Sequence, residues 1–115
     1  MKKVYIAGAM SANDILQVLQ NLHDGIEIGG DALQAGFAPF VSHFDSFFKL
    51  QKGVNFDIPM QRYYDYTMEW LKVSDIVLVC PNYKNSVGTL AEIKTAMELG
   101  IPVYYSLSEM VLKEI

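Results

Sequence analysis

Four short runs of apolar residues recur along the chain, and longer stretches in which apolar residues have helical spacing separate them. The runs show little polar alternation, which is typical of strands buried on both faces of a sheet. They lie at residues 4–7, 37–41, 76–80 and 103–105. The other stretches predict helices at about 13–35, 57–74, 86–99 and 108–115. Strands that alternate with helices in this order predict an α/β protein with a parallel sheet and right-handed crossovers.

This element order predicts a single domain over residues 1–115. We expect an open parallel sheet of four to five strands, flavodoxin-like or Rossmann-like, with helices on both faces. A chain of 115 residues is too short for two cores of ordinary size, which agrees with one domain.

The helical stretch 13–35 leaves two interpretations open. Its apolar residues recur at three-, four- and seven-residue spacing, which is typical of a helix; they are Leu19, Leu22, Ile26 and Leu33. Three glycines interrupt this pattern, each weakening a helix by about 1 kcal/mol relative to alanine. They are Gly25, Gly29 and Gly30. Either they allow close packing against the sheet, or the stretch is two helices with a break. Gly36 ends it in both cases.

The connection 42–56 is long and rich in phenylalanine, with Phe44, Phe47, Phe48 and Phe56. A connection of this length in a compact domain is usually a lid or a binding loop, but the phenylalanines could equally fill one end of the core. The next helix is predicted to begin at Asp57-Ile58-Pro59. Its apolar face is expected to contain Met60, Tyr64, Thr67, Trp70 and Leu71.

Composition and charge exclude several classes of function. Hydrophobic residues make up 51% of the chain, and 9 Lys+Arg stand against 13 Asp+Glu, a net charge of −4. This balance argues against binding of a nucleic acid polymer. The single cysteine, Cys80, cannot form an internal disulfide, and no Cys/His cluster suggests a metal, so we expect neither metal nor cofactor. The apolar runs are too short for a signal peptide or a membrane span, which favours a cytoplasmic protein.

In open parallel sheets, ligands bind beyond the carboxyl ends of the strands, where the strand order reverses. Three junctions therefore matter: 8–13 after the first strand, 42 onward after the second, and 81–88 after the third. None contains a G-x-G-x-x-G or Walker motif, so a classical dinucleotide or triphosphate site is not supported. At the third junction, Ser86 can cap a helix and Gly88 leaves the backbone N–H groups unobstructed, which favours a modest anion site.

Two side chains near these junctions are candidates for chemistry. Glu92 lies on the flank of its predicted helix, beside the apolar face of Leu90, Ile93, Ala96 and Met97. There it could reach into the crevice, although an ordinary surface glutamate would occupy the same place. His43 follows the second strand and could exchange a proton with a ligand, or it could simply bind backbone groups of the loop.

Three motifs occur in a characteristic order and spacing. They are Tyr5-Ile6-Ala7-Gly8-Ala9-Met10, Trp70-Leu71-x-x-x-Asp75-Ile76-Val77 and Ser86-x-Gly88-x-x-x-Glu92. Together they resemble the nucleoside 2-deoxyribosyltransferase-like superfamily, which includes nucleoside 2-deoxyribosyltransferases and 2′-deoxynucleoside 5′-monophosphate N-hydrolases. The resemblance extends from Lys3 to about Tyr105 and is nearest to small members of unassigned function.

The resemblance implies a function and a role for several residues. It implies cleavage or transfer at the N-glycosidic bond of a nucleoside or nucleoside 5′-monophosphate, with water or a second base as acceptor. Glu92 would be the nucleophile that attacks C1′ of the sugar, and Tyr5 would position it. Ser86 and Gly88 would receive a 5′-phosphate or 5′-hydroxyl. The remaining implied pocket residues are Gly8, Ala9 and Met10. The resemblance also implies a homodimer or a larger even homo-oligomer.

The chain departs from the family pattern at two positions. Ala9 replaces a common proline, and Thr67 replaces an aspartate that lies eight residues before the Asp75 position. A hydroxyl cannot act as a carboxylic acid near neutral pH, and we expect Asp65 to lie on the solvent face of its helix. Thr67 would still belong to the substrate pocket. A non-catalytic nucleotide-binding or nucleotide-signal-binding protein is therefore the alternative, whereas NAD or cyclic-ADP-ribose chemistry has no motif of its own.

Overall fold

A computed structural model of the chain describes residues 1–51 and 58–115. Four parallel strands form one open sheet in the order β2-β1-β3-β4. The strands are β1 (Lys3–Ala7), β2 (Ala38–Val41), β3 (Ile76–Val79) and β4 (Val103–Tyr104). β1 pairs with both β2 and β3, so that Tyr5 lies between Phe40 and Val77. The predicted α/β fold with an open parallel sheet is confirmed, with four strands.

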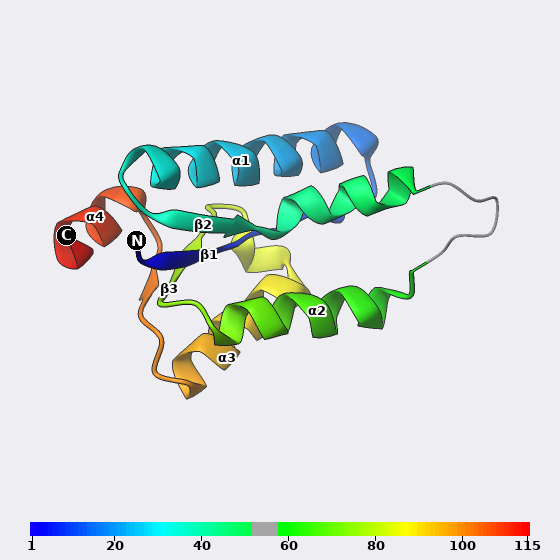
Figure 1. Ribbon diagram of the computed structural model, residues 1–115. Helices are drawn as coiled ribbons and strands as arrows, with labels where there is room; N and C mark the ends of the chain where they lie inside the picture. Colours follow the sequence, from blue (N-terminus) through cyan, green and yellow to red (C-terminus); the bar gives the residue numbers. More distant parts are fainter. Residues whose placement is uncertain (52–57) are drawn as a thin grey trace.

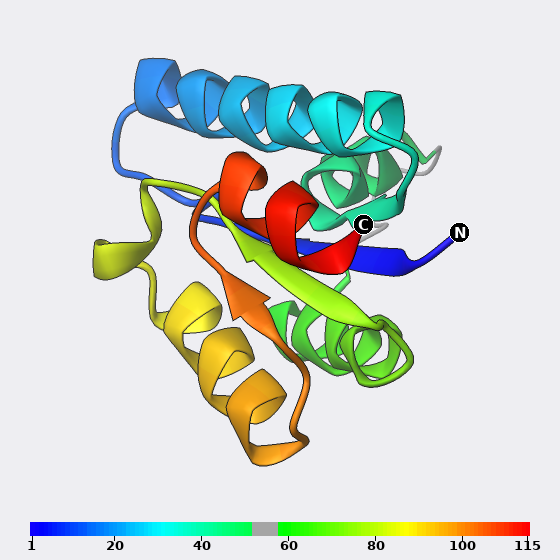
Figure 2. The ribbon, with the colours of Figure 1, turned by 90° about the vertical axis from the view of Figure 1, so that its left-hand side faces the viewer.

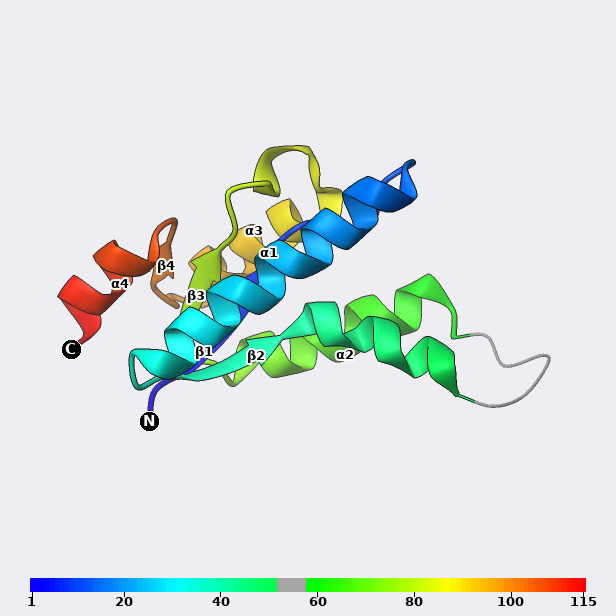
Figure 3. The ribbon, with the colours of Figure 1, turned by 90° about the horizontal axis from the view of Figure 1, so that it is seen from above.

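Helices cover both faces of this sheet (Figures 1 and 2). They are α1 (Ile15–Gln34), α2 (Met60–Lys72), α3 (Val87–Glu98) and α4 (Leu107–Glu114), together with the 3-10 helices η1 (Ser42–Leu50) and η2 (Tyr83–Asn85). α1 and α4 lie on one face, and α2 and α3 lie on the other (Figure 2). η1 and the start of α2 lie side by side and extend past the carboxyl ends of the strands (Figures 1 and 3).

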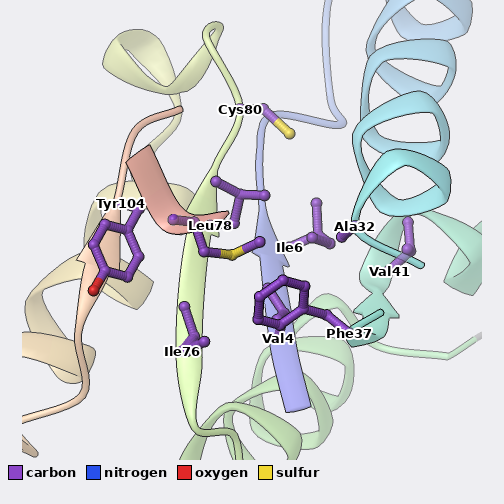
Figure 4. Close-up of a cluster of buried hydrophobic side chains, with 10 residues drawn as sticks. Val4, Ile6, Ala32, Phe37, Val41, Ile76, Leu78, Cys80 and Tyr104 are labelled. Atoms are coloured by element: carbon purple, nitrogen blue, oxygen red, sulfur yellow. The ribbon is translucent and has the colours of Figure 1, made fainter. Parts of the chain in front are cut away.

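Each face of the sheet has its own hydrophobic cluster, because successive side chains of a strand point to opposite faces. On the α1 face, Val4 and Ile6 pack with Ile76 and Leu78 among ten buried residues (Figure 4). On the α2–α3 face, Tyr5 and its neighbours of the second cluster are buried in the same way.

α1 is a single helix, so the predicted alternative of two helices with a break is wrong. The glycines allow close packing: a Cβ atom at Gly29 would lie 2.4 Å from Val41 Cγ2, and one at Gly25 would lie 2.4 Å from the His43 ring. Small residues therefore define the buried face of α1, whereas Leu19 and Leu33 remain 55% and 57% exposed.

The segment after β2 is helical rather than a plain loop. Phe44, Phe47 and Phe48 are about half exposed, so these three side chains do not fill the core. Phe56 and the predicted N-cap Asp57 lie outside the described residues, and α2 begins at Met60.

Several side chains expected on the buried faces of α2 and α3 are largely exposed. They are Met60, Tyr64, Trp70, Leu90 and Met97. Both helices are buried along narrow rows, which are Thr67 with Leu71 on α2 and Thr89 with Ile93 and Ala96 on α3. Trp70 instead stacks on Phe40 at 5.5 Å between ring centroids. At the other end of the sheet, the backbone N–H of Lys3 donates to Asp75 Oδ2 at 2.8 Å, as expected for a residue that fixes the strand start. Within the described ranges, no helix has the length and apolar character that a membrane crossing requires.

Candidate active site

A cavity of about 1130 Å³ lies at the carboxyl ends of β1, β2 and β3. Its walls come from the loop after β1, the first turns of α1, η1, α2 as far as Met68, the segment that connects β3 to α3, and the first half of α3. The strand order reverses at β1, which pairs with β2 on one side and β3 on the other. The cavity therefore occupies the position at which open parallel sheets bind ligands.

Glu92 is the carboxylate on the α3 wall of this cavity. It is largely buried and accepts a hydrogen bond from the hydroxyl of Tyr5. Burial raises its pKa to about 7, the Tyr5 hydrogen bond opposes the rise, and the charge of Asp45 adds to it. Near neutral pH, Glu92 is therefore balanced between its neutral and ionised forms.

Tyr5 lies beneath the cavity rather than in its lining. Its side chain is fully buried and stacks on Phe40 at 5.5 Å between ring centroids. Burial and the neighbouring Glu92 carboxylate raise the pKa of Tyr5, so the phenol stays protonated and remains a donor. Because β1 fixes the phenol in the core, Tyr5 can hold the carboxylate of Glu92 in one orientation.

Ser86 and Gly88 lie at the start of α3 and line the cavity. The Ser86 hydroxyl accepts hydrogen bonds from the backbone N–H of Thr89 at 3.2 Å and from Thr89 Oγ1 at 2.8 Å. Ser86 is thus the predicted helix cap, and Glu92 follows it on the same cavity wall. This arrangement directs the positive end of a helix into the cavity, which favours an anionic group there.

Gly8, Ala9 and Met10 also line the cavity. A network of side-chain amides fixes this loop: Ala9 N donates to Asn82 Oδ1, Asn82 Nδ2 donates to Asn21 Oδ1, and Asn21 Nδ2 donates to Met10 O. Asn21 is 3% exposed, so α1 and the loop after β3 together hold the loop after β1.

His43 lies behind this loop and does not line the cavity. It is fully buried next to Gly8 and Gly25, and neither ring nitrogen has a hydrogen-bond partner among the described residues. Burial lowers the pKa of His43, so the ring is neutral at pH 7. The structure therefore places His43 in the packing between α1 and the loop after β1, away from the cavity.

Thr67 lines the cavity from α2. Its hydroxyl donates to the backbone oxygen of Tyr64 at 3.2 Å, and Tyr64, which we expected in the core, lines the cavity as well. Asp65 is exposed at the rim, where Gln61 Nε2 donates to it at 2.9 Å. The structure thus puts the threonine, rather than Asp65, on the buried side of α2.

The sequence pattern pointed to the junction after the second strand but not to the residues of η1 that line the cavity. The polar residues of η1 recur at three- and four-residue spacing and all face the cavity, whereas the three phenylalanines are half exposed. These polar residues are Ser42, Asp45, Ser46 and Lys49. Their spacing is typical of one face of a helix and could have predicted this polar face. The phenylalanines between them instead suggested a lid, a binding loop or side chains that fill one end of the core.

Asp45 is the second buried carboxylate of the cavity. It is 8% exposed, and the hydroxyl of Tyr66 donates to its Oδ1 at 3.1 Å. Burial raises the pKa of Asp45 to about 6, although the Tyr66 hydrogen bond opposes the rise. The pKa values of the two buried carboxylates of the cavity, Asp45 and Glu92, therefore both lie near neutral pH. Within residues 1–51 and 58–115, no cluster of His, Cys, Asp or Glu has the arrangement of a metal site.

Comparisons with known proteins identify the family and the fold of the chain. The family model described as "domain of unknown function (DUF4406)" matches residues 2–105. Among solved structures, the chain is similar to a 2-deoxyribosyltransferase from the psychrotolerant bacterium Bacillus psychrosaccharolyticus, with a TM-score of 0.62 and 21% identity. The similarity covers 88% of this chain and 69% of that chain. No curated protein matches the sequence. The fold is thus nucleoside deoxyribosyltransferase-like, as the motifs indicated.

Proposed function

The chain belongs to the DUF4406 family, and from the site that its fold assembles we propose that it cleaves or transfers the N-glycosidic bond of a nucleoside or nucleoside 5′-monophosphate. The sugar is a ribose or a 2-deoxyribose, and the acceptor is water or a second base. A solved structure that resembles this chain is that of a 2-deoxyribosyltransferase, which supports a nucleoside as the class of substrate.

One observation carries the proposal: a buried carboxylate, Glu92, faces a ligand-sized cavity while Tyr5 holds it from below. Burial destabilises the ionised form of this carboxylate in the free protein, as its pKa of about 7 indicates. Positive charge that develops at C1′ as the glycosidic bond breaks would stabilise the same ionised form. The interaction is therefore stronger in the transition state than before the reaction, which is the condition for catalysis.

The reaction proceeds by two displacements at C1′. In the first, a Glu92 oxygen forms a bond to C1′ as the C1′–N bond breaks, and the electron pair of that bond remains on the base, which takes up a proton. In the second, the oxygen of water or the nitrogen of a second base attacks C1′ and releases the carboxylate. Configuration at C1′ is retained because it is inverted twice.

The start of α3 supports a role in substrate binding. Ser86 and Gly88 would contact the 5′ end of the substrate, with the helix N-terminus favouring a phosphate by about 0.3–2 kcal/mol. Lys49 and Lys84 line the same cavity and add positive charge. We therefore expect a several-fold preference for a nucleoside 5′-monophosphate over the nucleoside.

A panel of nucleosides and nucleoside 5′-monophosphates tests the proposal, with chromatography to detect the free base. The wild type should release base from at least one member, and Glu92→Gln should release none while binding it with similar affinity, because an amide cannot form the ester. Glu98→Gln is the matched control, since Glu98 is exposed at the other end of α3. Its activity should equal that of the wild type.

The same experiment separates catalysis from binding alone. If the wild type is folded and binds nucleotides but releases no base over hours, the glycosidic reaction is excluded and a nucleotide-binding protein is the remaining interpretation. The homodimer or larger even oligomer stays a prediction. The exposed apolar residues of α1, including Leu19 and Leu33, provide a surface that agrees with it.

A further inference from the structure

We propose that Asp45 is the general acid that gives the departing base its proton and the general base that activates the incoming water. This inference rests on the proposed function, because it assigns a second carboxylate to the same reaction. It concerns a residue on η1, a segment that none of the sequence motifs includes.

The reaction needs such a group, and the rest of the cavity does not supply it. A base that leaves as an anion leaves slowly, and a positioned acid accelerates such a step by about 10²–10⁴-fold. Thr67 faces the cavity, but its hydroxyl does not titrate near neutral pH and already donates to Tyr64 O. Asp65 is exposed at the rim. Asp45 is the carboxylate of η1 that is both buried and part of the cavity lining.

The topology of the sheet places the two carboxylates on either side of one central strand. η1 follows β2 and α3 follows β3, while β1 lies between these strands and carries Tyr5. Asp45 and Glu92 therefore approach the cavity from different walls, and Tyr5 contacts Glu92 from below. The charge of Asp45 acts on Glu92, as its contribution to the raised pKa of Glu92 indicates. A substrate between the walls would meet one carboxylate on each side.

The surroundings of Asp45 suit a group that gains and loses a proton near pH 7. Tyr66 on α2 binds Oδ1, which orients the carboxyl group and leaves Oδ2 to carry the proton. Burial raises the pKa of Asp45 to about 6. The other charged and titratable groups that line the cavity are Lys49 on η1, Tyr63, Tyr64 and Asp65 on α2, Lys84 on η2, and Glu92 on α3.

The two steps balance in protons and electrons. As Glu92 bonds to C1′, the C1′–N electron pair passes to the base nitrogen, which takes the proton of the Asp45 carboxyl group. The Asp45 carboxylate then removes a proton from water while the water oxygen bonds to C1′ and the bond to Glu92 breaks. The products are free base and free sugar, and both carboxyl groups return to their starting states.

Two substrates with the same sugar and different leaving bases test the assignment. One is a 2′-deoxynucleoside with ordinary guanine, and the other carries N7-methylguanine, whose positive charge allows it to leave without a proton. Asp45→Asn should slow release of guanine by about 10²–10⁴-fold and release of N7-methylguanine by less than about tenfold. Asp31→Asn, an exposed change on α1, is the control and should alter neither rate. Thermal unfolding confirms that each variant is folded.

The pH profile of the wild type provides a second, independent readout with any substrate whose base must take up a proton to leave. Activity requires ionised Glu92 and protonated Asp45, so pKa values of about 7 and about 6 give a narrow bell-shaped profile with its maximum between them. In Asp45→Asn the alkaline decrease should disappear, which loss of a merely structural residue would not cause.

The outcomes separate this inference from the proposed function. Equal slowing on both substrates with an unchanged bell-shaped profile, or no slowing at all, would overturn the role of Asp45 and leave Glu92 untouched. A wild type that releases neither base, and no base from the nucleoside panel, would overturn both proposals. Selective slowing on guanine with loss of the alkaline limb would support both.

Discussion

The two faces of the sheet bury titratable groups in opposite ways. On the α1 face, burial raises the pKa of Cys80 to about 12 and lowers that of His43, so both are neutral and inert at pH 7. On the α2–α3 face, burial raises the pKa of Glu92 to about 7 and that of Asp45 to about 6, which brings both into the physiological range. The same physical effect, desolvation, therefore keeps the groups on one side of β1 neutral at pH 7 and brings the pKa values of two carboxylates on the other side close to pH 7.

The packing of the helices differs between the two faces of the sheet. α1 approaches the sheet closely because Gly25 and Gly29 have no side chains to hold it away. α2 and α3 contact each other, but at the carboxyl end of the sheet their first turns, with η1, surround a cavity. Close packing on the α1 face fixes the loop after β1, and that loop supplies one wall of the cavity.

The largest change in stability is expected from adding a methyl group at Gly29, where α1 contacts the sheet. Gly29→Ala puts a Cβ atom 2.4 Å from Val41 Cγ2, so α1 must shift, and we expect the free energy of unfolding to fall by about 1–3 kcal/mol. Gly30→Ala on the next residue meets no atom within 4 Å and should raise it by up to about 1 kcal/mol. Urea denaturation measures both. Equal changes would show that close approach of α1 is not needed.

A smaller change in the free energy of unfolding, in the stabilising direction, is expected from replacing Glu92 on the cavity face. The folded-state pKa of Glu92, about 7, lies above the ordinary value of 4.5, so the folded protein binds more protons and loses stability as the pH rises from about 4.5 to about 7. Glu92→Gln escapes this loss and should be more stable than the wild type by about 1–2 kcal/mol at pH 8, but not at pH 4. Denaturation at the two pH values measures the difference. A variant that is less stable at pH 8 would contradict the destabilising burial of Glu92.

The sequence predicted the sheet well because buried strands leave a simple pattern. Each of the four apolar runs is a strand in the structure, and the ends of each strand lie within one or two residues of the ends that the sequence predicts. The buried face of α1 could not be predicted from hydrophobic spacing, because α1 contacts the sheet through glycines, which have no apolar side chain to mark that face. The apolar residues with helical spacing, Leu19, Leu22, Ile26 and Leu33, are not the ones that the helix buries most.

The candidate site was predictable where its residues follow one another on one element. Ser86, Gly88 and Glu92 belong to the start of one helix, and all three line the cavity. Asp45 was missed because its relation to Glu92 arises only when β2 and β3 flank β1. The position of His43 depended on its burial behind Gly8, which the chain order does not reveal.

The smallest expected effect is the change in the pKa of Glu92 when one hydrogen bond, between the Tyr5 hydroxyl and Glu92, is removed. Tyr5→Phe keeps the ring that stacks on Phe40 but removes the hydroxyl that donates to Glu92. Because that donor stabilises the ionised carboxylate, its loss should raise the pKa of Glu92 above about 7. A net hydrogen-bond contribution of about 0.5–1.5 kcal/mol corresponds to a shift of roughly 0.5–1 unit. NMR titration of the glutamate carboxyl carbons measures it.

Tyr66→Phe is the matched variant for this measurement, because its hydroxyl donates to Asp45 rather than to Glu92. By the same reasoning it should raise the pKa of Asp45 above about 6. It should have little direct effect on the pKa of Glu92, which the Asp45 charge raises only in part. If both variants moved the pKa of Glu92 equally, the two tyrosines would not act on separate carboxylates. If Tyr5→Phe lowered that pKa, the phenol would not be the donor that stabilises the ionised carboxylate, and its place beneath the cavity would have to be explained by packing alone.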